Sequence, residues 1–208
     1  ALGTLAQYAS EVGRSGYRVT LQYPSYQAVI TFADDRALRE EVYRAYATRA
    51  SDQGPDQGRF DNSARIEKIL ALRHEAAQLI GFANAAEESL ATKMAPSTAK
   101  VEAFLLDLVA RARPVAVREL AELREFAARE LGIADLAVWD TAYAAEKLRE
   151  RQFHFNEEDL KPYFPAEAAI NGLFVVAERA FGVRFARREG VDVWHPDVRY
   201  YDLVDADG

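Results

Sequence analysis

Apolar residues recur every three or four positions along most of the chain, a spacing typical of helices that bury one face. One helix is expected between Asn62-Ser63 and Gly81, because glycine commonly ends a helix. Its apolar face would consist of Ile66, Ile69, Leu70, Ala77 and Ile80. The longest pattern covers residues 97 to about 131 and contains Pro114. Proline removes a backbone donor and clashes with the preceding turn, so we expect a kink there or two successive helices.

Shorter helices are predicted by their start signals, which are a side-chain cap, acidic residues in the first turn or an early proline. They are expected from Asp34 or Asp35 to about residue 49, after Trp139-Asp140, from Asn156 with Glu157, Glu158 and Asp159, and from Pro165 to Gly182. The chain also begins with apolar residues at helical spacing, as though a helix were entered partway along.

Two short stretches have strand-like sequences. Arg18-Val19-Thr20-Leu21-Gln22-Tyr23 is a strand candidate that Pro24 would close. Arg199-Tyr200-Tyr201-Asp202-Leu203-Val204 is followed by Asp207-Gly208, which is a hairpin turn signal. We expect the partner of this second strand to lie beyond Gly208, and both ends of the chain to be cut from a longer protein. The unpaired edge of residues 199–204 predicts either disorder or dimers of no biological meaning.

These patterns predict a mostly α fold with a few short β-strands. The whole chain, residues 1–208, is expected to be one helical segment. Residues 1–55 would hold a strand and helices, and residues 56–208 the main helical part with short terminal strands. The loop at residues 51–58, with two glycines and a proline, is the weakest point in this segment.

Composition narrows the classes of function. Half of the 208 residues are hydrophobic, and 33 acidic against 26 basic residues give a formal net charge of -7, scattered along the chain. This argues against a nucleic-acid partner. The lack of cysteine excludes disulfides, thiolate catalysis and sulfur-ligated zinc, and is compatible with a cytoplasmic protein. No apolar run approaches the roughly 20 residues that span a bilayer, and no signal-peptide pattern is present, so no membrane partner is expected.

The most suggestive short motif is Arg73-His74-Glu75-Ala76-Ala77-Gln78. Two histidines four residues apart on a helix, with a glutamate after the first, build a zinc peptidase site. Here Gln78 replaces the second histidine, and one imidazole cannot hold the metal. We therefore assign no metal ligand, and we interpret His74 as a helix-surface or packed residue.

The remaining candidates for catalysis lack partners in the sequence. His154 and His195 could each act as a base, but neither has a recognisable nucleophile, and residues 54–58 lack the lysine of a phosphate loop. The acidic clusters Glu87-Glu88 and Glu157-Glu158-Asp159 are interpreted as solvated helix faces. Aromatic residues that could line a cleft are interpreted as core: Tyr43, Tyr46, Trp139, Tyr143, Tyr163, Phe164 and Phe174. No catalytic or cofactor-binding residue is assigned.

Several ordered blocks resemble the oligopeptidase A family of zinc peptidases, which are of the thimet-oligopeptidase type. The longest block is residues 38–54, LREEVYRAYATRASDQG. The others are residues 61–63, 69–75, 90–95, 111–114, 139–140, 162–165, 171–174 and 192–196. The resemblance covers residues 16 to 208.

The resemblance implies a mostly helical enzyme whose two lobes flank a deep channel, with zinc on its floor and short peptides, including cleaved signal peptides, as substrates. In that family a His-Glu-x-x-His helix and a later glutamate hold the metal. These residues are absent here and would lie beyond residue 208. The segment is thus expected to bind no zinc, to be inactive alone and to form channel wall through residues 97–131. The alternatives are a free-standing helical module that binds peptides or proteins, and a self-contained enzyme using His154 or His195.

Overall fold

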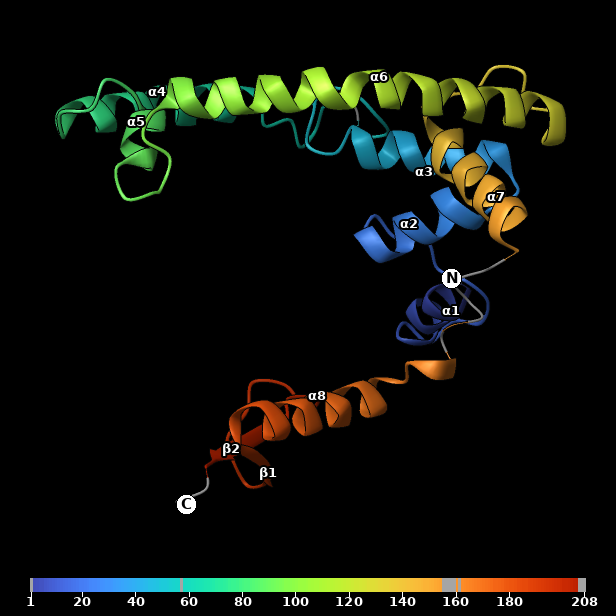
Figure 1. Cartoon of the computed structure of the whole chain (residues 1–208). Helices are drawn as coiled ribbons and strands as arrows, with labels where there is room; N and C mark the ends of the chain where they lie inside the picture. Colours follow the sequence, from blue (N-terminus) through green and yellow to red (C-terminus); the bar gives the residue numbers. More distant parts are fainter. Residues whose placement is uncertain (1, 57, 155–159, 161, 206–208) are drawn as a thin grey trace. The chain divides into compact units, whose positions relative to one another are not determined.

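The computed structural model describes residues 2–56, 58–154, 160 and 162–205. The chain divides into two compact units, residues 1–154 and 155–208, which we describe separately. The described residues are mostly helical with two short strands, which confirms the predicted fold class (Figure 1). The expected subdivision into residues 1–55 and 56–208 stays a prediction.

All the regular secondary structure described in the first unit is helical. Its elements are α1 (Leu2–Ser10), α2 (Tyr23–Phe32), α3 (Arg36–Ala47), α4 (Ser63–Leu79), α5 (Ala85–Leu90), α6 (Thr98–Glu130), the short 3-10 helix η1 (Val138–Asp140) and α7 (Thr141–Phe153). The second unit contains α8 (Ala166–Phe181), β1 (Arg184–Arg188) and β2 (Tyr200–Val204).

Side-chain caps begin several of these helices. Of the two predicted candidates, Asp34 and Asp35, it is Asp35 that caps α3: its carboxylate accepts hydrogen bonds from the amides of Ala37 and Leu38 at 2.9 and 3.1 Å. The hydroxyl of Ser97 likewise accepts from the amide of Lys100 at the start of α6. These polar side chains fix helix starts that the sequence already indicated.

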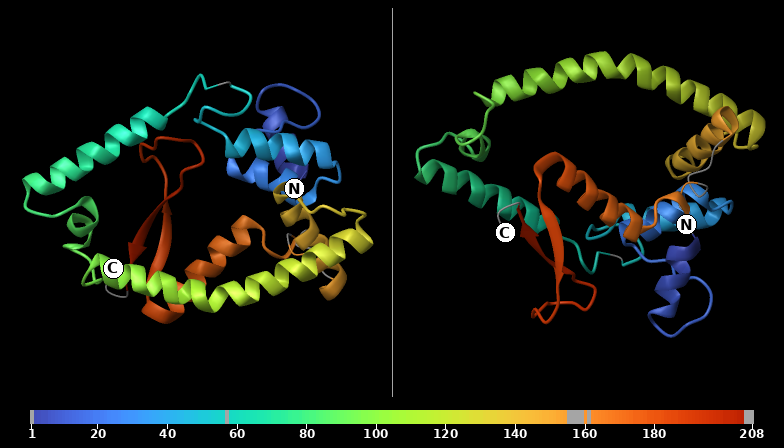
Figure 2. Two further views of the ribbon diagram at one scale, coloured as in Figure 1. Left: turned by 90° about the horizontal axis from the view of Figure 1, so that it is seen from above. Right: turned by 60° about the horizontal axis from the view of Figure 1, so that its bottom comes forward.

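Helix α6 is one continuous helix of 33 residues with Pro114 inside it. This excludes the alternative of two successive helices. Both views in Figure 2 show α6 as a long, curved helix. A proline within a helix removes one backbone hydrogen bond, and the curvature is the usual response to that loss.

Two small hydrophobic clusters hold the first unit together. One joins α1, α2 and α3 through Leu5, Ala28, Val29 and Val42. The other joins α6 to α7 through Leu123, Ala127 and Ala144, with flanking residues Leu131, Ile133, Leu136 and Leu148. The packing is therefore concentrated around α2, α3, α7 and the C-terminal part of α6.

The prediction of a strand at residues 18–23 was wrong. Residues 18–20 have no regular secondary structure, and helix α2 begins at Tyr23 with Pro24 in its first turn. Side chains instead satisfy the backbone here: the hydroxyl of Ser25 accepts from the amide of Thr20 at 2.8 Å, and Arg49 donates to the carbonyl of Leu21 at 2.9 Å. Because proline suits a first helical turn, Pro24 opens a helix rather than closing a strand.

The second unit corrects another expectation. The partner of β2 is β1, which lies earlier in the chain, and the two run antiparallel with Arg184 opposite Val204 and Arg188 opposite Tyr200. The sequence RFARR has too many arginines to read as a strand by apolar alternation, so the pairing was missed. The strand is thus not unpaired, although each strand of a two-stranded sheet keeps one free edge, and dimerisation through residues 199–204 stays a prediction.

Helix α8 packs on this hairpin through aromatic rings. Phe174 stacks on Phe185 with ring centroids 4.3 Å apart, and it meets Tyr201 edge-on at 4.9 Å. Gly182 ends α8 with a positive φ of 72°, as predicted, because a left-handed residue suits the position after a helix. The short helix expected from Asn156 lies outside the described residues.

Candidate functional site

The three histidines belong to three different segments of the chain. His74 lies exposed on α4, and His154 follows α7 in a left-handed conformation with its amide bonded to the carbonyl of Glu150. His195 lies in the β1–β2 connection, where its Nδ1 accepts from the amide of Asp197 at 3.2 Å. Within the described residues, no group of three or more histidine, aspartate or glutamate side chains could hold a metal ion.

A buried cluster of charged side chains joins α3 to the start of α7. Asp140 is fully buried, and its Oδ1 accepts from Arg39 Nη2 at 2.7 Å. Its Oδ2 accepts from Arg36 Nε at 3.0 Å and from the amide of Ala137 at 3.1 Å. Arg39 is also buried, and donates to the carbonyls of Ala33 and Asp34.

Aromatic rings surround this cluster. The guanidinium of Arg39 lies 4.1 Å from the ring centroid of Tyr143, whose hydroxyl donates to Asp34 at 2.9 Å. Tyr43 of α3 lies beside Trp139 of η1 with ring centroids 6.0 Å apart. Tyr43, Trp139 and Tyr143 therefore pack between elements, which agrees with their interpretation as core.

Burial and hydrogen bonding oppose each other at Asp140. Burial raises the pKa of this carboxyl, but hydrogen bonds from Arg36, Arg39 and Ala137 lower it more, and the net pKa lies below the usual aspartate value. Both carboxylate oxygens are occupied by donors and neither is accessible to solvent. Asp140 thus cannot take part in proton transfer to a substrate, and the cluster ties two distant parts of the chain together.

Sequence reasoning did not find this cluster. Arg39 and Asp140 are separated by 101 positions, and nothing local marks them as partners. The available signal was indirect: an arginine at position 39 lies three residues before the buried Val42, on the face of α3 that packs inward.

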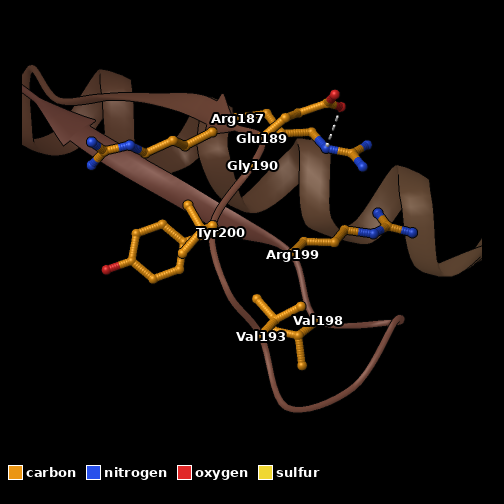
Figure 3. Close-up of a pocket in the computed structure, with 9 residues that line it drawn as sticks. Arg187, Glu189, Gly190, Val193, Val198, Arg199 and Tyr200 are labelled. Carbon is orange, nitrogen blue, oxygen red and sulfur yellow. Dashed lines mark ion pairs between the residues drawn. The ribbon is translucent and has the colours of Figure 1, made fainter.

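The hairpin carries a small hollow of about 230 Å³, lined by charged and apolar side chains. In Figure 3, Val193 and Val198 lie next to each other while Arg199 points away from them. The arginines here already have carboxylate partners: Arg187 pairs with Glu189, Arg188 with Asp202 and Arg199 with Glu167. This arrangement stabilises the hairpin and leaves little free charge for a ligand.

The remaining candidates from the sequence divide between core and surface. Glu87 and Glu88 are exposed in the first turn of α5, as interpreted, while Glu157, Glu158 and Asp159 lie outside the described residues. Tyr46 stacks on Tyr26 with ring centroids 3.9 Å apart. By contrast Tyr163 and Phe164 are 77% and 70% exposed, so their interpretation as core is wrong for this chain.

Large apolar side chains are left uncovered on three helices. Helix α4 exposes apolar residues on opposite sides, with Ile66 and Leu70 on one and Leu72 and Leu79 on the other. Further uncovered residues lie on α6 and α8: Phe104, Leu105, Leu106, Leu108, Val109, Leu173, Val176 and Phe181. Large apolar side chains left exposed on a helix commonly mark an interface.

Comparison with known proteins identifies the family to which this chain belongs. The profile of peptidase family M3 matches residues 29–208. Since that match spans most of the chain, the protein belongs to peptidase family M3. The expected resemblance is thereby confirmed, and the helical segment is one part of a peptidase fold.

Within the family, the chain is most informatively compared with oligopeptidase A. It is 52% identical over 205 residues to the proteins of that name from Salmonella typhimurium and Escherichia coli, covering 99% of this chain and 30% of each of theirs. It is 32% identical over 205 residues to the dipeptidyl carboxypeptidase of Escherichia coli, covering 98% of this chain and 30% of that one. The chain thus spans about 30% of the length of these curated relatives.

The residues of this chain do not fit a zinc site of the type expected for the family. The sequence has no His-Glu-x-x-His motif, and Gln78 stands where the second histidine after His74-Glu75 would be needed. His74 is exposed on α4, without a cluster of acidic or histidine ligands among the described residues. We therefore derive no catalytic step from this segment.

Proposed function

We propose that this chain is a non-catalytic helical portion of a zinc-dependent oligopeptidase that hydrolyses short peptides, including cleaved signal peptides. The single observation that carries the proposal is 52% identity to oligopeptidase A over 205 residues that make up 30% of the relative. Zinc would be held by the part of the enzyme outside these residues. The buried Arg39–Asp140 cluster supports a structural role here, because both oxygens of Asp140 accept hydrogen bonds from this chain and neither is left for a substrate.

We propose that this protein is cytoplasmic, with which its lack of cysteine is compatible. Separately, no helix in the described part of the chain is both long and apolar enough to cross a membrane. Two relatives from Arabidopsis thaliana, 40% and 41% identical over 219 residues, are named organellar oligopeptidase A, chloroplastic/mitochondrial, and probable cytosolic oligopeptidase A, so these names do not decide between compartments.

Within the enzyme, we propose that α6 forms wall of the channel that leads to the zinc. A continuous helix of 33 residues is about 50 Å long at 1.5 Å per residue, which is long enough to border such a channel. A wall of this kind would admit short peptides and exclude folded proteins.

The proposal is tested by metal analysis and by hydrolysis of a quenched fluorescent oligopeptide with added zinc. The 208-residue chain is expected to bind no stoichiometric zinc and to cleave nothing, while the full-length enzyme that carries it cleaves the peptide and loses activity with a chelator. Stoichiometric zinc and chelator-sensitive cleavage by the 208-residue chain would refute a non-catalytic role. A full-length protein without peptidase activity would refute the proposed parent activity.

A second candidate is a free-standing helical module that binds a peptide or a protein. The observation in its favour is an apolar groove between α5 and α6, lined by Leu90, Val101, Leu105 and Leu106 among others. It predicts that the 208-residue chain binds an amphipathic helical peptide by itself. Titration of such a peptide, with fluorescence anisotropy as the measurement, separates this module from the peptidase portion.

A further inference from the structure

One apolar stripe runs along the whole of α6. Its members are separated by three or four positions, which places them on the same side of the helix. The α6 stripe consists of Val101, Leu105, Leu108, Ala112, Ala116, Leu120, Leu123 and Ala127.

The α6 stripe is fully covered only at its C-terminal end, while Val101 at its N-terminal end is half-buried beside α5. Leu123 and Ala127 pack against α7 and are 8% and 0% exposed. Leu105 and Leu108, on the same side of the same helix, are 53% and 46% exposed. The main neighbours of α6 within the described residues of its unit are α5 and α7, which lie near its two ends, so the middle of the stripe is left bare.

The other side of α6 has the character of a solvent-facing surface. The i,i+4 ion pairs Asp107–Arg111 and Glu125–Arg129 lie there, with all four side chains mostly exposed. Pro114 is two positions from both Ala112 and Ala116, which places it opposite the stripe. Long helices curve with their convex side toward solvent, and a proline on the outer side agrees with that orientation.

We propose that the bare part of the α6 stripe, residues 105–116, is an interface with the rest of the peptidase polypeptide. The stripe continues an interface that already exists with α7, so the same side of the helix faces protein along its length. This chain corresponds to only 30% of its relatives, which leaves about 70% of such a protein to supply the covering surface. The inference rests on the proposed function in one respect, because it takes the covering surface to be the remaining part of the peptidase. It also places the charged side of α6 in contact with water.

Thiol accessibility in the full-length peptidase tests this assignment. Because these 208 residues contain no cysteine, Leu105→Cys and Leu108→Cys each introduce a single thiol into the segment. Arg118→Cys, at an exposed position off the stripe, is the control in the same helix. The maleimide labelling rate of each variant is measured natively and in urea, after subtraction of the rate for the unaltered protein.

Both stripe variants are expected to label at least about tenfold more slowly than Arg118→Cys in the native protein, and equally fast in urea. Native labelling of Leu105→Cys and Leu108→Cys at the control rate would overturn the interface. Protection that disappears on dilution would also overturn it, because a second copy would then be the occupant. Peptide hydrolysis by the unaltered protein is measured separately: protection without hydrolysis refutes only the proposed activity, and hydrolysis without protection refutes only the interface.

Discussion

A buried arginine and a buried aspartate connect α3 to the start of α7 in the first unit. The side chains of Arg39 and Asp140 are 1% and 0% exposed, and Nη2 of Arg39 lies 2.7 Å from Oδ1 of Asp140. Removing two charges from water is costly, and the cost is offset only when both partners keep their hydrogen bonds. The pair therefore links α3 to the start of α7, and removal of either side chain would leave the other buried without its partner.

Asp140→Asn is expected to lower the free energy of unfolding of the chain by about 3–5 kcal/mol, because it leaves the Arg39 guanidinium buried without its counter-charge. Asp107→Asn is the matched control, since Asp107 pairs with Arg111 on an exposed helix face and its loss should cost about 0.3–0.5 kcal/mol. Urea unfolding followed by circular dichroism measures both. Equal small losses for the two variants would show that the cluster contributes little.

The lowered pKa of Asp140 also predicts a pH dependence. A carboxyl whose pKa is lower in the folded state contributes stability above its unfolded pKa, about 3.9, and loses it as the pH falls through the folded value. We expect the free energy of unfolding to fall below about pH 4, with a smaller fall in Asp140→Asn. Urea titrations at pH 3 to 7 compare the two proteins, and identical profiles would contradict the assignment.

At the scale of elements, α6 combines a strong start with an internal proline. Ser97 caps the helix, and 33 residues follow without interruption. Proline in a helix interior is unfavourable by about 3 kcal/mol relative to alanine, so packing must hold the helix through Pro114. The contacts of Leu123 and Ala127 with α7 provide part of that stabilisation.

Pro114→Ala is expected to stabilise the chain by up to about 3 kcal/mol, because it restores a backbone donor and removes the clash with the preceding turn. Val117→Ala, at an exposed position of the same helix, is the control and should change stability little. The measurement is urea unfolding together with helical content by circular dichroism. A loss of stability in Pro114→Ala would indicate that the curvature itself is required for packing.

At the scale of the whole molecule, the proposed wall makes α6 a determinant of substrate size. In the full-length enzyme, Arg111→Gly with Arg113→Gly should loosen the helix, since glycine is about 1 kcal/mol less favourable than alanine at each position. Arg111→Ala with Arg113→Ala removes the same charges and keeps the helix.

The glycine variant is expected to cleave a folded protein substrate that the alanine variant and the unaltered enzyme reject. Product analysis by mass spectrometry detects such cleavage, with a short peptide as the reference substrate. If the glycine variant still rejects folded proteins while its helix is measurably destabilised, α6 does not set the size limit.

The sequence by itself determined the elements whose signals are local. The start of α3 at Asp34 or Asp35, the start after Ser97, the stop at Gly182 and the mostly α class all follow from side chains within one or two helical turns. The family also followed from the sequence, because ordered blocks carry that information without any contact. Where a local signal was ambiguous the prediction failed, as at Pro24, which suits both the end of a strand and the first turn of a helix.

Only the tertiary structure decided which distant residues meet. The Arg39–Asp140 link spans 101 positions, and the pairing of β1 with β2 depends on a strand too rich in arginine to be recognised alone. The structure also decided which apolar residues are covered: Leu105 and Leu123 have the same helical phase in the sequence, but only Leu123 meets α7. Periodicity reports which face of a helix is apolar, whereas burial depends on whether another element lies against that face.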